Sequence, residues 1–201
     1  MSIFFKKTFF IVGLFSFFFV QLAVADTITD RIDLAKRKYL EGKFKEAISE
    51  LEFAAGLIKQ KKAEEIKMLL PDPLSGWKAQ EAKSGAAPLF LGGGSSASRK
   101  YYNDNGATVE ISIISDAPLL SSLLMMLANP NFIGAGNKIT MVKGEKAIEE
   151  WDDVQKSGKL TIVLGEKVLV IVEGSNLANK EILYKFAELL NFEKIKKLTG
   201  G

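Results

Sequence analysis

The residue types that most often carry out catalysis are missing from this sequence. The chain has 201 residues and contains no His and no Cys. Without them it cannot build thiolate nucleophiles, iron–sulfur centres, histidine general bases or histidine metal ligands. Carboxylates, Lys, Tyr, Ser and Thr remain as functional groups. We therefore predict a protein that is not an enzyme, with no catalytic residue, no metal site and no cofactor.

Two short segments resemble catalytic or phosphate-binding motifs without matching them. Residues 92–96 read Gly-Gly-Gly-Ser-Ser, but a phosphate-binding loop ends in Gly-Lys-Ser/Thr at the start of a helix, and a strand is expected here. Ser75 and Lys78 have the spacing of a Ser-x-x-Lys nucleophile motif, but Pro73 and Gly76 disfavour the helix it requires. A carboxylate-based or Ser/Lys hydrolase is the least favoured function.

Four carboxylates gather in one short segment. They are Glu149, Glu150, Asp152 and Asp153. Paired carboxylates can serve in glycoside hydrolysis or as calcium ligands, but alternation along a strand sends Glu149 and Glu150 to opposite faces. The pattern instead favours an edge strand that charge protects from pairing.

Apolar residues indicate a binding surface more directly. The stretch Leu119–Ala128 is apolar on nearly every side and is followed by more apolar residues in an Asn- and Gly-rich segment. Core packing explains part of this stretch, but one helix cannot hide every side, and Met adapts well to varied contacts. Tryptophans are typical core or interface anchors. The candidate apolar binding surface comprises Met125, Met126, Phe132, Ile133, Trp77 and Trp151.

The first 25 residues have the pattern of a secretory signal peptide. Lys6 and Lys7 precede an apolar run over Thr8–Val20, and Ala23-Val24-Ala25 supplies small residues before a cleavage point. We predict cleavage after Ala25, a periplasmic or extracellular location, and no stable membrane anchor afterwards. Cleavage leaves 25 basic and 24 acidic residues, which is too balanced for a nucleic-acid-binding protein.

Residues 26–70 are expected to form a helical hairpin. Apolar residues recur at steps of three and four from Ile28 to about Leu70, and Gly42 interrupts the pattern as a turn would. The residues Leu34-Ala35, Gly42, Phe44, Ala47-Ile48, Leu51 and Ala54 resemble a tetratricopeptide hairpin. Because the resemblance occurs once and such units are stabilised by stacking, it implies that the hairpin packs on its own domain or on another chain. An ordinary amphipathic hairpin is the alternative.

Residues 97–201 are expected to form an α+β domain after a linker and flexible loop at residues 71–96. The pattern predicts an antiparallel sheet of about five to six strands with two helices packed on it. The predicted strands are 98–102, 108–114, 138–142, 146–152, 159–164 and 167–173, and the predicted helices are 117–128 and about 176–190. Both alternating faces of Val168–Val172 are apolar, so both faces of that strand should be covered.

This C-terminal region resembles the PsbP-like fold. The resemblance lies in the approach at Gly144–Ala147, the hairpin over Leu160–Glu173 and the closing helix. It implies a binding or assembly role more than catalysis and assigns no functional residue.

We therefore predict an exported periplasmic accessory or adaptor protein that acts by binding another envelope protein or a second copy of itself. The alternative is a carrier or sensor of a small apolar ligand such as lipid, which would need a cavity between the sheet and the 117–128 helix.

Overall fold

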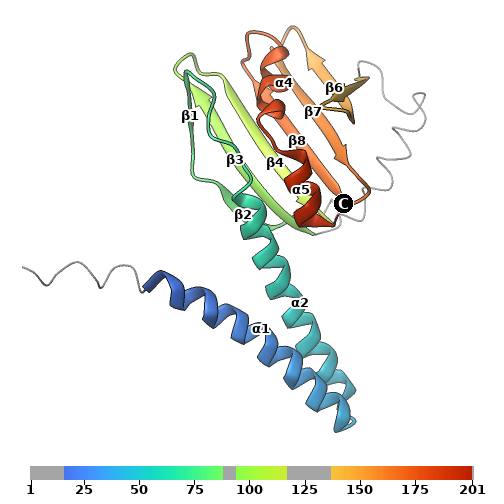
Figure 1. Ribbon diagram of the computed structural model, residues 1–201. Helices are drawn as coiled ribbons and strands as arrows, with labels where there is room; N and C mark the ends of the chain where they lie inside the picture. The colour runs from blue at the N-terminus through green and yellow to red at the C-terminus, as the bar shows by residue number, and fades with distance from the viewer. Residues whose placement is uncertain (1–15, 88–93, 117–136, 201) are drawn as a thin grey trace, which may run out of the picture. The chain divides into compact units, whose positions relative to one another are not determined.

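The protein has an α+β fold, as predicted. The computed structural model describes residues 16–87, 94–116 and 137–200. A helical hairpin is followed by an antiparallel sheet and two C-terminal helices (Figure 1). The described residues fall into two compact units that divide between Ile58 and Lys59. The predicted helix at 117–128 lies outside the described residues.

The first unit contains the helical hairpin. Helix α1 covers Ser16–Leu40 and α2 covers Phe44–Lys67. Gly42 joins them with a φ of 75°, a left-handed conformation that glycine adopts without strain. The buried side chains between the two helices within this unit are Ile28, Ala35, Ala47 and Ala54. Three of these are alanines.

The second unit is built on one antiparallel sheet. In the described residues it has eight strands, in the order β1-β3-β4-β8-β7-β6-β5, with β2 also paired to β3. The strands are β1 (Trp77–Ala79), β2 (Lys83–Ala86), β3 (Ser95–Asn103), β4 (Thr108–Ser115), β5 (Asn137–Val142), β6 (Glu145–Asp152), β7 (Ser157–Leu164) and β8 (Val168–Ser175). All their pairings are antiparallel.

The six longer strands coincide with the six predicted ones. The two additional strands, β1 and β2, have three and four residues and lie in the range that the sequence assigned to linker and loop. They carry no alternating apolar pattern, and both pair only with the edge of β3. Backbone hydrogen bonds to a neighbouring strand form them, and such bonds leave little trace in the side-chain pattern.

The carboxylate-rich strand β6 is not at an edge. It lies between β5 and β7, so the prediction of a charged edge strand was wrong. The prediction that Glu149 and Glu150 face opposite ways is confirmed, because Glu149 meets Lys180 beside helix α4 whereas Glu150 pairs with Lys159 on β7. Glu149 and Glu150 each pair with a lysine, one on each face of β6. These two carboxylates therefore do not require an edge position.

The β3–β4 turn forms as its Asn-Gly sequence predicts. The Asn103 side-chain oxygen accepts hydrogen bonds from the backbone N–H groups of Asn105, at 3.0 Å, and Ala107, at 3.1 Å. Gly106 has a φ of 78°. This local bonding fixes the register of β3 against β4.

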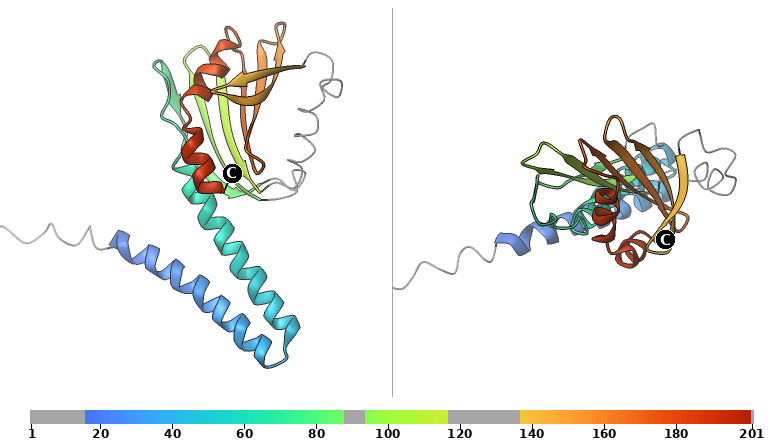
Figure 2. Two further views of the ribbon diagram at one scale, coloured as in Figure 1. Left: turned by 45° about the vertical axis from the view of Figure 1, so that its right-hand side comes forward. Right: turned by 90° about the horizontal axis from the view of Figure 1, so that it is seen from above.

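Two helices cover one face of the sheet. They are α4 (Glu181–Glu188) and α5 (Phe192–Thr199), where a single closing helix was predicted (Figure 2). Helix α4 ends before Asn191, and a new helix begins there. The Asn191 side chain accepts a hydrogen bond from the backbone N–H of Lys194 and so caps α5. The core on this face includes Leu183, Phe186, Leu190, Ile195, Tyr101, Ile111, Leu160, Ile162, Val170, Val172 and Ile66.

The opposite face of the sheet also contains buried apolar side chains. Leu169 on β8 is 2% exposed, and Ile114, Val163 and Ile148 on the neighbouring strands are similarly buried. Val168, Val170 and Val172 are buried on the helix-covered face. Ile171, on the same face as Leu169, is only partly buried. The prediction that both faces of this strand are covered is therefore confirmed at Leu169 and only in part at Ile171.

Gly158 on β7 has no side chain, which leaves room for Trp151 on β6 and Leu183 on α4 to pack against it. An alanine Cβ at this position would lie 2.6 Å from the Glu150 carbonyl oxygen, 2.6 Å from a ring carbon of Trp151 and 3.2 Å from Leu183 Cδ1. We expect Gly158→Ala to lower the free energy of unfolding by about 1–3 kcal/mol, the usual cost of overpacking. Urea unfolding followed by circular dichroism measures it.

Gly56 provides the matched control. It lies within α2 with no positive φ, and a Cβ at this position would have no neighbour within 4 Å. Gly56→Ala should stabilise the helix by up to about 1 kcal/mol. A Gly158→Ala variant as stable as the parent protein would contradict the close packing around Gly158.

Candidate functional site

One side of the helical hairpin is held together by charge. Arg31 pairs with Glu50 at 2.9 Å, and Lys38 pairs with Glu46 at 2.7 Å. The Arg31 guanidinium also lies 4.7 Å from the centre of the Phe53 ring. These contacts link α1 to α2 along one face, which we call the charged hairpin face.

The other side of the hairpin is apolar and exposed. The α2 residues that form it recur at steps of four and three, and α1 adds two more at a step of seven, which places them in one stripe across both helices. This apolar hairpin face consists of Phe44, Ile48, Leu51, Ala55 and Ile58 from α2, and Ile32 and Tyr39 from α1. Its six large side chains are between 42% and 63% exposed.

The exposure follows from how α1 and α2 pair. Ala47 and Ala54 lie seven residues apart on α2 and occupy the contact with α1. The larger apolar residues lie on the adjoining strip of α2, turned away from α1 by the helix geometry. Tyr39 and Phe44 contact each other at a ring-centre distance of 5.7 Å, but their outer surfaces remain open. The hairpin thus buries its small side chains and leaves its large ones at the surface.

Sequence reasoning identified these residues without recognising the surface. Their spacing predicts the two helices of the hairpin, but it does not show which strip of α2 faces α1 and which faces water. The signal that could have revealed the surface is the width of the α2 pattern: apolar residues occupy two adjacent strips, whereas one neighbouring helix covers only one.

The predicted site residues do not gather in the described structure. Met125, Met126, Phe132 and Ile133 lie outside the described residues. Trp77 packs edge-on against Phe186 with ring centres 5.0 Å apart. Trp151 packs against the same core, and its Nε1 donates a hydrogen bond to Asp153. Four strands lie between β1 and β6 in the sheet order, so the two tryptophans occupy separate parts of the sheet.

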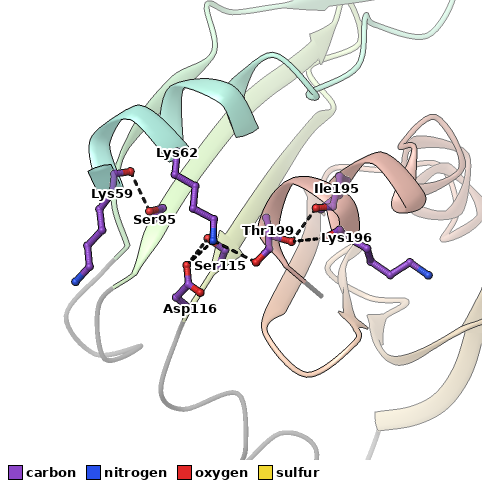
Figure 3. Close-up of polar contacts among 8 residues, drawn as sticks. All are labelled: Lys59, Lys62, Ser95, Ser115, Asp116, Ile195, Lys196 and Thr199. Carbon is purple, nitrogen blue, oxygen red and sulfur yellow. Dashed lines mark hydrogen bonds and ion pairs between the residues drawn. The ribbon is translucent and has the colours of Figure 1, made fainter. Parts of the chain in front are cut away.

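A polar cluster joins three elements of the second unit (Figure 3). The Lys62 ammonium on α2 lies 2.8 Å from an Asp116 carboxylate oxygen after β4 and 3.2 Å from the Thr199 carbonyl oxygen at the end of α5. Burial disfavours ionisation of Asp116, but hydrogen bonds from Lys62 and Ser115 outweigh it and hold its pKa below the usual value. Nearby, the Ser95 hydroxyl donates a hydrogen bond to the Lys59 carbonyl oxygen. Lys62, Asp116, Ser115 and Thr199 form one connected network, and the Ser95–Lys59 bond is a separate link between β3 and α2. Together these bonds have the geometry of a structural clamp.

A second polar cluster fixes α4 to the sheet. Glu149 accepts hydrogen bonds from the Tyr184 hydroxyl at 2.5 Å and from Lys180 at 2.9 Å. Burial raises the pKa of Glu149, but these two hydrogen bonds outweigh burial, so the net effect is a pKa below the usual value. Burial raises the pKa of Tyr184, and its bond to the carboxylate adds to that effect.

A polar cavity lies along one end of the sheet in the second unit. It has a volume of about 580 Å³. Strand register aligns a row of charged residues that line it: Lys100, Glu110, Glu173, Lys159 and Glu150. Lys159 and Glu150 are paired at 2.8 Å. This lining suits polar rather than apolar molecules.

Comparisons of the chain with known protein families, with characterised proteins and with solved structures find no match. Within the described residues, α1 and α2 are long helices, but neither they nor any other helix combines the length and apolarity needed to cross a membrane.

The Glu149 cluster makes a prediction about acid stability. Because the folded-state pKa of Glu149 is depressed, its contribution is present above the unfolded pKa of about 4.3 and is lost as the pH falls through the folded value. Glu149→Gln should therefore lower the unfolding free energy by about 1–3 kcal/mol at neutral pH. The difference from the parent protein should shrink below about pH 4 in urea unfolding measured from pH 2 to 8.

Glu150→Gln is the control on the opposite face of the same strand. Its partner Lys159 is 36% exposed, so we expect a loss of about 0–1 kcal/mol. Equal losses in the two variants, or a pH-independent difference for Glu149→Gln, would contradict the assigned role of the cluster.

Proposed function

We propose that this chain is an exported accessory protein that acts by binding another protein through the apolar hairpin face. The exposure of the six large apolar side chains on that face supports the proposal. Single exposed apolar residues are common, but a continuous row across two paired helices costs solubility unless a partner covers it.

The shape of the face indicates the kind of partner. Rows of side chains on neighbouring helices form ridges and grooves that accept the apolar stripe of another helix. The charged hairpin face carries its own ion pairs, Arg31–Glu50 and Lys38–Glu46, so it has less to gain from burial. A helical partner is therefore expected on one side of the hairpin only.

The carrier alternative has weaker support. The cavity that it needs, between the sheet and residues 117–128, lies outside the described residues. The cavity described on the sheet is lined mainly by charged and hydroxyl-bearing residues, and a small apolar ligand gains little from such a lining. We therefore retain protein binding as the single proposed function.

Export is the second part of the proposal. Cleavage after Ala25 would leave residues 26–40 of α1, a segment of the same length as residues 44–58 of α2. The mature hairpin would then consist of two matched helices.

The N-terminus can be measured directly. Intact mass and N-terminal sequencing of the protein purified from the cell envelope should give a chain that begins at Asp26. A chain that retains Lys6 and Lys7 at its N-terminus would contradict cleavage, whereas protein confined to the cytoplasm would contradict export.

Photo-crosslinking tests the binding face. A benzophenone amino acid at Ile48 should give protein adducts in intact cells, because that position lies on the apolar hairpin face. The neighbouring Ser49 is also exposed but points away from this face, so a probe there should give few adducts. Adduct masses on denaturing gels identify the products.

A second substitution distinguishes specific binding from random crosslinking. Leu51→Ser in the chain that carries the Ile48 probe should remove the adducts by making the face polar. Equal adducts at positions 48 and 49, or adducts unaffected by Leu51→Ser, would refute binding through this face.

A further inference from the structure

We infer that the partner of the apolar hairpin face is a second copy of this chain, so that two hairpins form an antiparallel four-helix bundle. This inference rests on the proposed function, since it uses the same face. The observations that carry it are the pattern of charges along the borders of the face and the sizes of the side chains within it.

The hairpin has the form of half a bundle. Residues 44–58 of α2 are 15 residues long, or about 22 Å. Residues 26–40 of α1 match them, and the ion pairs Arg31–Glu50 and Lys38–Glu46 set the two helices level. One side is charged and the other apolar. Two such layers placed face to face bury both apolar sides, as in four-helix bundles.

Four charged residues border the apolar hairpin face. Helical geometry places Lys45 and Glu52 along its α2 border and Lys36 and Asp33 along its α1 border. All four are exposed, and none forms an ion pair within the described part of the chain. Their charges can therefore pair with a neighbouring molecule.

One symmetric arrangement pairs the two α2 border charges favourably, although on α1 it brings Asp33 near Asp33 of the second copy. If α2 packs antiparallel on α2 of the second copy with Ile48 opposite Leu51, the two-fold axis also brings Leu51 opposite Ile48. Lys45 then lies beside Glu52 of the second copy, and Glu52 lies beside Lys45. Two opposite-charge contacts form by symmetry at the borders of the interface.

The same register fits the side-chain volumes. Phe44, the largest apolar residue of the α2 row, falls opposite Ala55, the smallest, and symmetry repeats the pair at the other end. Large side chains opposite small ones give interdigitated layers without voids.

The competing arrangements place the α2 border charges beside like charges. A shift of the α2 pair by seven residues sets Glu52 against Glu52 of the second copy. Packing α2 on α1 of the second copy sets Lys45 beside Lys36 and Glu52 beside Asp33. Like charges at an interface disfavour wrong registers, so the charge pattern selects the α2-to-α2 arrangement.

The interface should be of modest strength. Two helices about 22 Å long and about 9 Å apart give a footprint of about 400 Å². Stable interfaces bury about 800 Å² of accessible surface on each partner. We therefore expect a dissociation constant in the micromolar range, about 1–100 μM.

Sedimentation velocity of the purified chain tests the inference. In the N-terminal form found in the cell, the protein should change from monomer to dimer between about 1 and 300 μM. Leu51→Ser, which removes two buried leucines per dimer, should weaken the dimer about 100-fold or more. Phe53→Ser is the matched control: Phe53 is 50% exposed and Leu51 52%, but Phe53 lies on the charged hairpin face, so this variant should still dimerise.

Charge reversal tests the register without altering the apolar face. Lys45→Glu and Glu52→Lys should each weaken the dimer about 10-fold, and the double variant should recover to within about three-fold of the parent. Helix content by circular dichroism shows that each variant is folded.

The outcomes distinguish this inference from the proposed function. A chain that stays monomeric at about 300 μM, or a double variant without recovery, overturns the bundle. A third outcome is that the crosslinked products at Ile48 contain a different protein and disappear with Leu51→Ser. That result would support binding through the apolar hairpin face and refute the second copy as its partner. If Leu51→Ser changes neither assembly nor adducts, both fail.

Discussion

The close pairing of α1 and α2 through alanines determines which surface this protein presents. Ala35, Ala47 and Ala54 occupy the contact between the helices, so the helices come together without using the larger apolar residues. Burying a methyl group yields little hydrophobic free energy compared with burying Leu or Ile. The hairpin is consequently held by small residues and by ion pairs on one face, while Ile48 and Leu51 stay in contact with water. A larger residue at Ala47 would push the helices apart and change the shape of the apolar hairpin face.

The second unit differs because its large apolar side chains are mostly buried and its buried polar atoms have hydrogen-bond partners within the unit. Its sheet is covered by α4 and α5, and its core extends from Ile66 on α2 to Ile195 on α5. Its buried carboxylate, Glu149, has two hydrogen-bond donors, and no buried side-chain nitrogen or oxygen in the described residues lacks a partner. Groups bonded in this way rigidify a fold. The exposed apolar row that supports the proposed binding lies in the hairpin.

Local patterns predicted the elements but not their surroundings. The Asn103–Gly106 turn and the continuous apolar run along β8 were predictable because the signal lies in the residues themselves. β1 and β2 were not, because they exist through pairing with β3 and have no apolar pattern of their own. The predicted closing helix ended at Leu190, next to the cap at Asn191, but α5 was missed because it is only eight residues long. The exposure of Ile48 depended on which strip of α2 faces α1, and periodicity alone does not distinguish a strip that meets another helix from one that meets water.

The proposed binding function needs no reactive side chain. Helical geometry can present Leu51 and Ile48 to a partner with no reactive group nearby, because hydrophobic contact requires only shape and area. Area alone does not choose a partner, since any apolar helix would gain from the same burial. In the proposed bundle the unpaired charges at Lys45 and Glu52 supply that choice: they disfavour a shifted neighbour and favour an antiparallel one with the same sequence. A face that is apolar at its centre and alternately charged at its border therefore encodes both the attraction and the register of its partner.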